Sequence, residues 1–185
     1  ETLQAIEAVA EHKGPCYVRV GRNKVPTVTG ENYRFKIGKA QVLQEGKDAA
    51  IIATGLMVAE ALKARDLLKA EGIDAGVINM STIKPLDTDA VVAAAKRCGA
   101  IVTAEEHSII GGLGGAVAEA LAESWPAPMA RIGVKDQFSI CIAGYPLEIM
   151  QSEDFRVVLS EVRLGGRSVA LRMFANGIIL RGLSE

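Results

Sequence analysis

Short apolar runs alternate with helical stretches over most of residues 40–134. Runs rich in Ala, Val and Ile predict strands over 40–44, 49–53, 75–80, 100–104 and 129–134. Between them, apolar residues in amphipathic order predict helices over about 57–70, 88–96 and 113–124. Because strands that alternate with helices form right-handed crossovers, this order predicts a three-layer α/β/α fold with a mainly parallel sheet.

Residues with special backbone preferences mark the ends of these helices. Gly72 is placed to close the first helix at the position after its C-cap, and Gly99 ends the second. Asp87 is placed as the N-cap of the second helix, and a metal-binding role is not needed to explain it. Pro126 and Pro128 end the third helix.

The first thirty residues follow a different pattern. Residues 2–12 carry apolar positions at helical spacing, and Gly14-Pro15 stops the predicted helix. Residues 16–20 predict a short buried strand. A stretch rich in Gly, Asn and Pro follows over 21–32, so the predicted domain boundary lies there, near residue 30.

The regular pattern fades after Phe138. Residues 139–185 mix apolar and charged positions without a clean period, so short strands are compatible with the segment but not required by it. The choice of basic residues also changes: residues 1–138 hold ten Lys and six Arg, whereas residues 139–185 hold five Arg and no Lys. The segment therefore does not continue the pattern of the α/β region.

Composition and charge narrow the function classes. The chain has 185 residues, 49% apolar and 23% charged, and a net charge of −1, which is typical of a globular protein and argues against a nucleic-acid-binding surface. No apolar run reaches the ~18 residues of a membrane span, and no signal peptide is recognised. Cys16, Cys98 and Cys141 lie far apart, which predicts reduced thiols, a cytoplasmic location and no structural metal site.

Two arginines are the first candidate binding residues. Arg22 follows the predicted strand 16–20, and Arg19 lies within that strand. Ligands of α/β folds gather near the carboxyl ends of strands, and a guanidinium there can bind a phosphate or carboxylate through two parallel hydrogen bonds. The alternative is an ordinary surface arginine on a loop.

Glu105, Glu106 and His107 follow the predicted strand 100–104 at its carboxyl end. A carboxylate beside an imidazole can perform acid–base chemistry or orient a partner. Neighbouring residues of an extended segment point to opposite sides, so at most some of the three share one site. The alternative is a polar cluster that caps the next turn or lines an interface.

Glycines at 111, 112, 114 and 115 precede the third predicted helix. Backbone N–H groups at such a turn can bind a phosphate, although the spacing is neither a dinucleotide fingerprint nor a P-loop. The alternative is close packing of the helix against the sheet or a neighbouring subunit. The residues alone therefore indicate an α/β domain with a candidate anion site and no identifiable catalytic set.

Six strings in order nevertheless resemble one family, the transketolases. They resemble its C-terminal domain, and residues 1–30 resemble the end of the preceding pyrimidine-binding domain, so the resemblance covers residues 1–138. The strings are Gly38–Leu43, Gly46–Asp48, Thr82–Asp87, Glu105–His107, Gly111–Gly114 and Arg131–Phe138.

The resemblance implies a transferase that moves a two-carbon ketol unit between sugar phosphates in the pentose phosphate pathway. It implies thiamine diphosphate and a divalent metal, Mg or Ca, bound by domains absent from this chain, with neither cofactor nor catalytic residue in the chain itself. The implied partners are the remaining transketolase domains, or an N-terminal subunit if the enzyme is split, and a second copy in a homodimer. Alone, the chain is expected to be inactive.

The resemblance also assigns roles to particular residues. Arg22 matches the family's arginine that binds the substrate phosphate, and Arg19 is a second candidate in the same string, Arg19-Val20-Gly21-Arg22. The family role of the C-terminal domain is mainly packing and dimer support, which favours interface or sheet-edge roles for a further set of residues. That set is Glu106, His107, Gly111, Gly112 and Gly114.

The chain departs from the family after Phe138, where a Gly/Ser-rich turn and a last helix are expected. We hypothesise that residues 139–185 are an out-of-frame or unrelated tail. Two alternatives for the whole function stay open. One is a piece of the related 1-deoxyxylulose-5-phosphate synthase or of a 2-oxoacid dehydrogenase β subunit. The other is a non-catalytic interaction module that binds an anion near Arg22 and Glu106.

Overall fold

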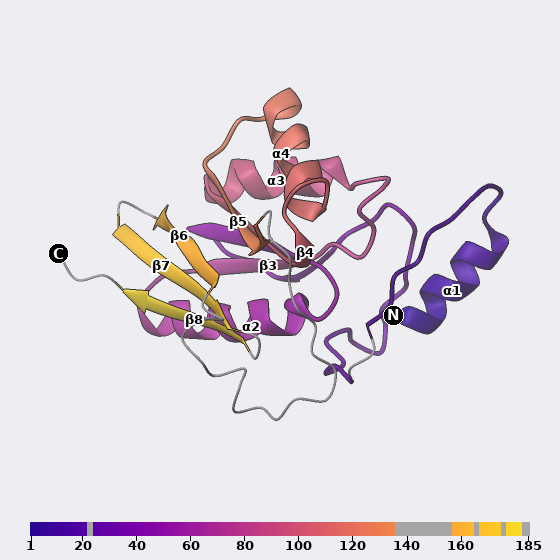
Figure 1. The fold of residues 1–185 in the computed structure, drawn as a ribbon, viewed down its shortest axis with the longest axis horizontal. Helices are drawn as coiled ribbons and strands as arrows, with labels where there is room; N and C mark the ends of the chain where they lie inside the picture. Colours follow the sequence, from indigo (N-terminus) through magenta and orange to yellow (C-terminus); the bar gives the residue numbers. More distant parts are fainter. Residues whose placement is uncertain (22–23, 136–156, 165–166, 175–176, 183–185) are drawn as a thin grey trace.

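The computed structural model describes residues 1–21, 24–135, 157–164, 167–174 and 177–182, with side chains as far as residue 135. Figure 1 shows the arrangement of these elements. The helices are α1 (Thr2–Glu11), α2 (Met57–Ala70), α3 (Thr88–Cys98) and α4 (Leu113–Ser124). The strands are β1 (Gln41–Gln44), β2 (Ala49–Ala53), β3 (Ala75–Asn79), β4 (Ile101–Ser108), β5 (Met129–Val134), β6 (Val157–Leu164), β7 (Arg167–Phe174) and β8 (Gly177–Gly182).

The central sheet has five strands in the order β1-β3-β2-β4-β5. β2 pairs in parallel with β3 and β4, and β4 pairs in parallel with β5. β1 lies antiparallel to β3 at one edge. The predicted mainly parallel sheet is therefore confirmed.

Strand β2 shows how the layers form, because all five of its residues are buried. Ala49, Ile51 and Ala53 belong to one apolar core with α2, whereas Ala50 and Ile52 belong to a second core with α3 and α4. Figure 1 shows α2 on one face of the sheet and α3 with α4 on the other. Two covered faces explain the continuous apolar runs of the strands and confirm the three-layer architecture.

The helix ends follow the predicted local chemistry. Gly72 and Gly99 have φ angles of +81° and +69°, the left-handed conformation that glycine adopts without a steric penalty. The Asp87 side chain accepts a hydrogen bond from the Ala90 N–H at 3.2 Å, which confirms it as the N-cap of α3. Its other oxygen accepts from the Ala40 N–H at 3.0 Å and so joins α3 to the segment before β1.

We expect Asp87→Ala to lower the free energy of unfolding by about 1–2 kcal/mol, because it removes both backbone contacts of this cap. Asp89→Ala is the matched control: it lies in the same helical turn, but its side chain is 98% exposed. Urea denaturation of the full chain measures both variants. Equal midpoints would show that the cap contributes nothing beyond ordinary helix propensity.

Two predicted strand assignments are wrong. Residues 16–20 form no regular structure and are exposed, because no described strand lies beside them to complete a ladder. β4 does not stop at Ala104 but continues to Ser108, which pairs with Val134 after a register irregularity. Glu105 and His107 therefore lie on the strand itself rather than in a loop after it, although they still lie at its carboxyl end.

Helix α1 is confirmed, but its apolar face is uncovered: Leu3 is 81% exposed and Ile6 is 48% exposed. The helix is held by polar contacts at its amino end. Gln4 accepts a hydrogen bond from the Phe35 N–H at 2.7 Å, and the Glu1 carboxylate accepts from the Asn79 side-chain amide at 2.7 Å. Figure 1 shows α1 standing beside the body of the molecule rather than within its layers.

The described part of residues 139–185 is a second sheet of three antiparallel strands in the order β6-β7-β8. The backbone of β6 approaches β5, and that of β8 approaches α2 (Figure 1). The stretch 136–156, where the Gly/Ser-rich turn was expected, lies outside the described residues.

Candidate functional site

The carboxyl ends of β3 and β4 carry the polar groups that the N-terminal segment contacts. Asn79 ends β3 and donates to Glu1, while His107, near the end of β4, contacts Arg19. Because β2, β3, β4 and β5 run in parallel, these ends lie along one edge of the sheet. In open α/β sheets this edge is where ligands bind.

Arg19 and His107 were proposed separately from the sequence, and the structure brings them together. Nη1 of Arg19 lies against Nε2 of His107. A guanidinium has only donors, so Nε2 accepts, the ring is neutral, and its remaining proton is on Nδ1. Burial, and then the neighbouring Arg19 charge, lowers the pKa of His107, which favours this neutral form. Arg22 lies outside the described residues.

Glu105 has the capping role that the sequence left open as the alternative to acid–base chemistry. Its side chain is fully buried, and its two oxygens accept hydrogen bonds from the N–H groups of Leu113 at 2.8 Å and Gly114 at 2.7 Å. These donors lie in the first turn of α4, where a carboxylate is also favoured by the helix dipole. Burial raises the pKa of Glu105, and the two hydrogen bonds and the Arg131 charge oppose that rise. Glu105 therefore caps α4 from the neighbouring strand.

The glycines make room for this carboxylate. A Cβ atom on Gly112 would lie 2.0 Å from Oε2 of Glu105, and one on Gly114 would lie 2.8 Å from Cδ of Arg131. Gly111 has a φ of +72°, which favours glycine at that point of the turn. The N–H groups of Leu113 and Gly114, which could have bound a phosphate, are occupied by Glu105. The glycines at the start of α4 therefore allow the helix to pack closely against Glu105 and Arg131 of the sheet.

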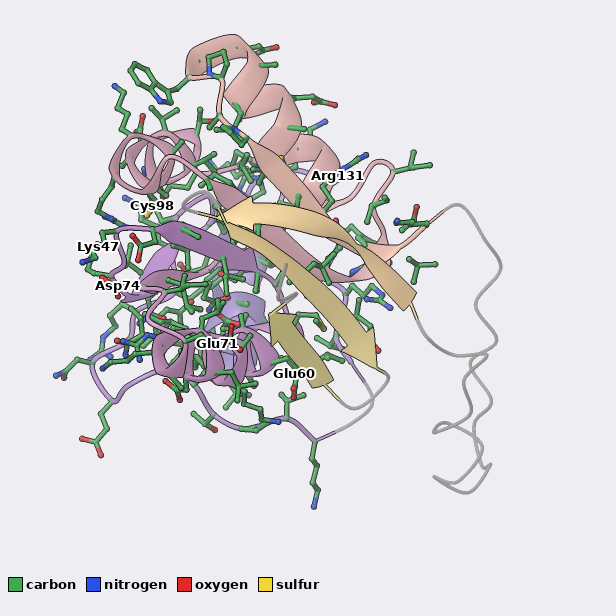
Figure 2. All side chains as sticks on the ribbon, turned by 90° about the vertical axis from the view of Figure 1, so that its left-hand side faces the viewer. Lys47, Glu60, Glu71, Asp74, Cys98 and Arg131 are labelled. Carbon is green, nitrogen blue, oxygen red and sulfur yellow. The ribbon has the colours of Figure 1, made fainter. Side chains whose placement is uncertain are left out.

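The edge residues divide by the side of the strand on which they lie. Glu105 is buried, Glu106 is exposed and His107 is half-buried, as the alternation of a strand requires. Arg131 of β5 donates a hydrogen bond to the Ile109 carbonyl at 3.0 Å and so holds the turn after β4 (Figure 2). Glu106 is therefore separated from the Glu105 cap, and the structure does not bring it together with Arg19 in any hydrogen bond or ion pair of the described residues.

A second polar cluster at the same edge was missed by sequence reasoning. Tyr33 donates its hydroxyl proton to the Glu1 carboxylate at 2.8 Å, and Glu1 also accepts from Asn79. Burial, together with this carboxylate, raises the pKa of Tyr33 to about 12. The three residues come from segments far apart in the chain, so no local pattern could have grouped them.

The described residues contain no group of three or more His, Cys, Asp or Glu that could hold a metal ion. Within the same ranges, none of the helices combines the length and apolar character needed to cross a bilayer. The side-chain contacts described at this edge are the hydrogen bonds of Glu1 with Tyr33 and Asn79 and the contact of Arg19 with His107.

These features define the chain as an α/β protein whose carboxyl edge is spanned by its own N-terminal segment. The family model described as transketolase, C-terminal domain, matches residues 38–144, a span that contains the whole five-stranded sheet. The chain belongs to the transketolase C-terminal domain family, as the six sequence strings predicted.

Individual relatives agree with this assignment. A 6-deoxy-6-sulfo-D-fructose transketolase subunit from Clostridium sp. (strain MSTE9) is 48% identical over 134 residues, which are 72% of this chain and 42% of that protein. A 1-deoxy-D-xylulose-5-phosphate synthase from Heliobacterium modesticaldum (strain ATCC 51547 / Ice1) is 35% identical over 92% of this chain and 26% of its own length.

A solved structure described as a split gene transketolase, inactive beta4 tetramer, is also similar. It is 48% identical, has a TM-score of 0.74, and covers 76% of this chain and 46% of its own. The chain thus spans less than half the length of each of these three relatives.

Proposed function

We propose that this chain is the C-terminal part of a thiamine-diphosphate-dependent transketolase that transfers a two-carbon ketol unit between sugar phosphates. In this proposal the chain supplies packing and dimer support and contributes an arginine to the substrate phosphate. The observation that supports it is the position of Arg19, which lies against His107 at the carboxyl edge of the sheet in a transketolase-family domain.

The cofactor itself does not fit the described residues. They provide no cluster of metal ligands, and the α4 N-terminus that would suit a diphosphate is filled by Glu105. The proposal therefore assigns thiamine diphosphate and its metal to the rest of the enzyme. Residues 1–30 are proposed to be the end of a pyrimidine-binding domain, residues 31–138 the C-terminal domain, and residues 139–185 a divergent segment.

Exposed apolar side chains support the proposal that other parts of the enzyme pack against this chain. Leu3, Ile6, Tyr17 and Val20 are exposed in the N-terminal segment, where a partner domain or subunit would cover them. The similar solved structure is described as an inactive beta4 tetramer of a split gene transketolase. We extend this to the present chain and propose a cytoplasmic enzyme that is assembled from dimers and inactive as this chain alone.

A second candidate is 1-deoxyxylulose-5-phosphate synthesis. It is favoured by the synthase relative that aligns with 92% of this chain, a larger share than the transketolase relative does. Both reactions use a sugar phosphate, so the proposed role of the arginine string is the same in each. Assay of the assembled enzyme with pyruvate and with a ketose phosphate as alternative donors distinguishes them.

We expect the chain alone, with thiamine diphosphate and Mg²⁺, to show no ketol transfer, and addition of the subunit that carries the cofactor-binding domains to restore turnover. In the restored enzyme, Arg22→Ala should raise KM for a sugar phosphate about 10- to 100-fold, because a charge-assisted hydrogen bond contributes ~1.5–3 kcal/mol. Arg34→Ala is the control, since within the described residues that guanidinium donates hydrogen bonds to the backbone carbonyls of Glu31 and Tyr33 and to no other group. A KM unchanged by Arg22→Ala would exclude this role.

A further inference from the structure

The segment over residues 13–30 crosses the carboxyl edge with few attachments. Its described residues are exposed apart from Val28 and Thr29, which are half-buried. Within the described residues, the Arg19–His107 contact is the one side-chain hydrogen bond that joins this segment to the α/β layers. The placement of the Arg19 side chain therefore depends on His107.

A histidine has a particular advantage as the partner of Arg19. Its neutral ring accepts one of the five guanidinium N–H donors and leaves the others free. A carboxylate at the same place would cancel the arginine charge, and Arg19 forms no ion pair in the part of the chain that the structure describes. The imidazole thus orients Arg19 while its positive charge stays available to an anion.

His107 is itself held by the packing of its strand. The side chain of Glu105, two residues earlier on β4, is anchored by the α4 N–H groups of Leu113 and Gly114. The backbone carbonyl of His107 would lie only 2.9 Å from a Cβ atom on Gly133 of β5, so the two strands are in close contact there. A residue on a paired strand with anchored neighbours can therefore hold Arg19 in a defined position.

We propose that His107 is a positioning residue for Arg19: it holds the guanidinium through a neutral acceptor, so that Arg19 presents its positive charge to the phosphate of the substrate. This inference rests on the proposed function, because it concerns the same phosphate. It gives His107 no role in proton transfer and no direct contact with the reacting carbon atoms.

The kinetic test uses the assembled enzyme and two acceptors, an aldose phosphate and the same aldose without its phosphate. His107→Ala is expected to raise KM for the phosphorylated acceptor about tenfold, with kcat unchanged and the unphosphorylated acceptor unaffected. His107→Gln should restore the KM, because its amide oxygen can accept from Arg19. Glu106→Ala, the exposed neighbour, is the matched control. Equal losses for both acceptors, or no rescue by glutamine, would overturn the proposal.

A second measurement needs no turnover. In NMR spectra of the full chain, the guanidinium signals of Arg19 should show restricted rotation in the native and His107→Gln proteins and free rotation in His107→Ala. Titration with inorganic phosphate should shift these signals less in His107→Ala. Identical Arg19 signals in all three proteins would overturn the positioning role. A native assembly without ketol transfer would instead overturn the proposed function, and the NMR result would still decide the role of His107.

Discussion

Replacement of Gly46 by alanine is expected to lower the free energy of unfolding by about 3 kcal/mol or more. A Cβ atom there would lie 2.0 Å from the Gly76 nitrogen and 2.4 Å from the Ala75 carbonyl carbon, both of which are backbone atoms of β3. Because a backbone cannot move aside as a flexible side chain can, β3 would have to shift within a sheet buried on both faces.

The surroundings of Gly46 offer little room for such a shift. Its carbonyl accepts hydrogen bonds from Nε of Arg97 at 3.1 Å and from Sγ of Cys98 at 3.2 Å. The next residue, Lys47, donates its N–H to the Asp74 carbonyl at 3.0 Å. Figure 2 shows Lys47, Asp74 and Cys98 on the left of the view, away from Arg131. The turn therefore joins β1, β3 and α3.

Gly30→Ala is the matched control for Gly46→Ala. Gly30 is exposed, nothing lies within 4 Å of the position of its added Cβ, and its backbone does not adopt a positive φ. Chemical denaturation of the full chain, followed by circular dichroism, should leave this variant within about 0.5 kcal/mol of the native protein. Equal midpoints for the two variants would contradict the close approach of the Gly46 turn to β3.

Glu105→Ala is expected to lower the free energy of unfolding by about 3–5 kcal/mol. The change leaves the buried N–H groups of Leu113 and Gly114 without acceptors, at about 1–3 kcal/mol each, and opens a cavity beside Arg131. Glu106→Ala removes the exposed neighbour and should be nearly neutral. A small loss for Glu105→Ala would show that water or another group replaces the carboxylate at the α4 N-terminus.

The contribution of Glu105 to the free energy of unfolding is expected to depend on pH. Burial raises the pKa of Glu105 in the folded protein above its ordinary value of 4.5, so the folded state holds the proton more tightly than the unfolded state does. The resulting stabilisation is full below the unfolded pKa and is lost as the pH rises through the folded pKa. The stability of the native protein relative to Glu105→Gln should therefore fall from acid to neutral pH. If the stability of the native protein relative to Glu105→Gln rose with pH instead, the two backbone hydrogen bonds would lower the pKa of Glu105 by more than burial raises it.

Much of the α/β region follows from local chemistry and was predicted from the sequence. The predicted strands over 49–53 and 129–134 and the helix over 57–70 coincide with β2, β5 and α2. Asp87 is the N-cap of α3, and Gly72 and Gly99 adopt the left-handed conformation after α2 and α3. These features depend on neighbours within a few residues, so periodicity and backbone preference are enough to specify them.

Only the tertiary structure decides the remaining features, because each of them depends on a partner that is distant in sequence. Residues 16–20 have strand-forming side chains but no described neighbour strand, and they stay exposed. Glu105 has an ionisable side chain and yet lies fully buried, because the first turn of α4 supplies N–H groups that donate hydrogen bonds to its carboxylate. Arg19 and His107 were each recognised as polar residues of interest, but they are 88 residues apart in the chain, and the fold alone brings them into contact.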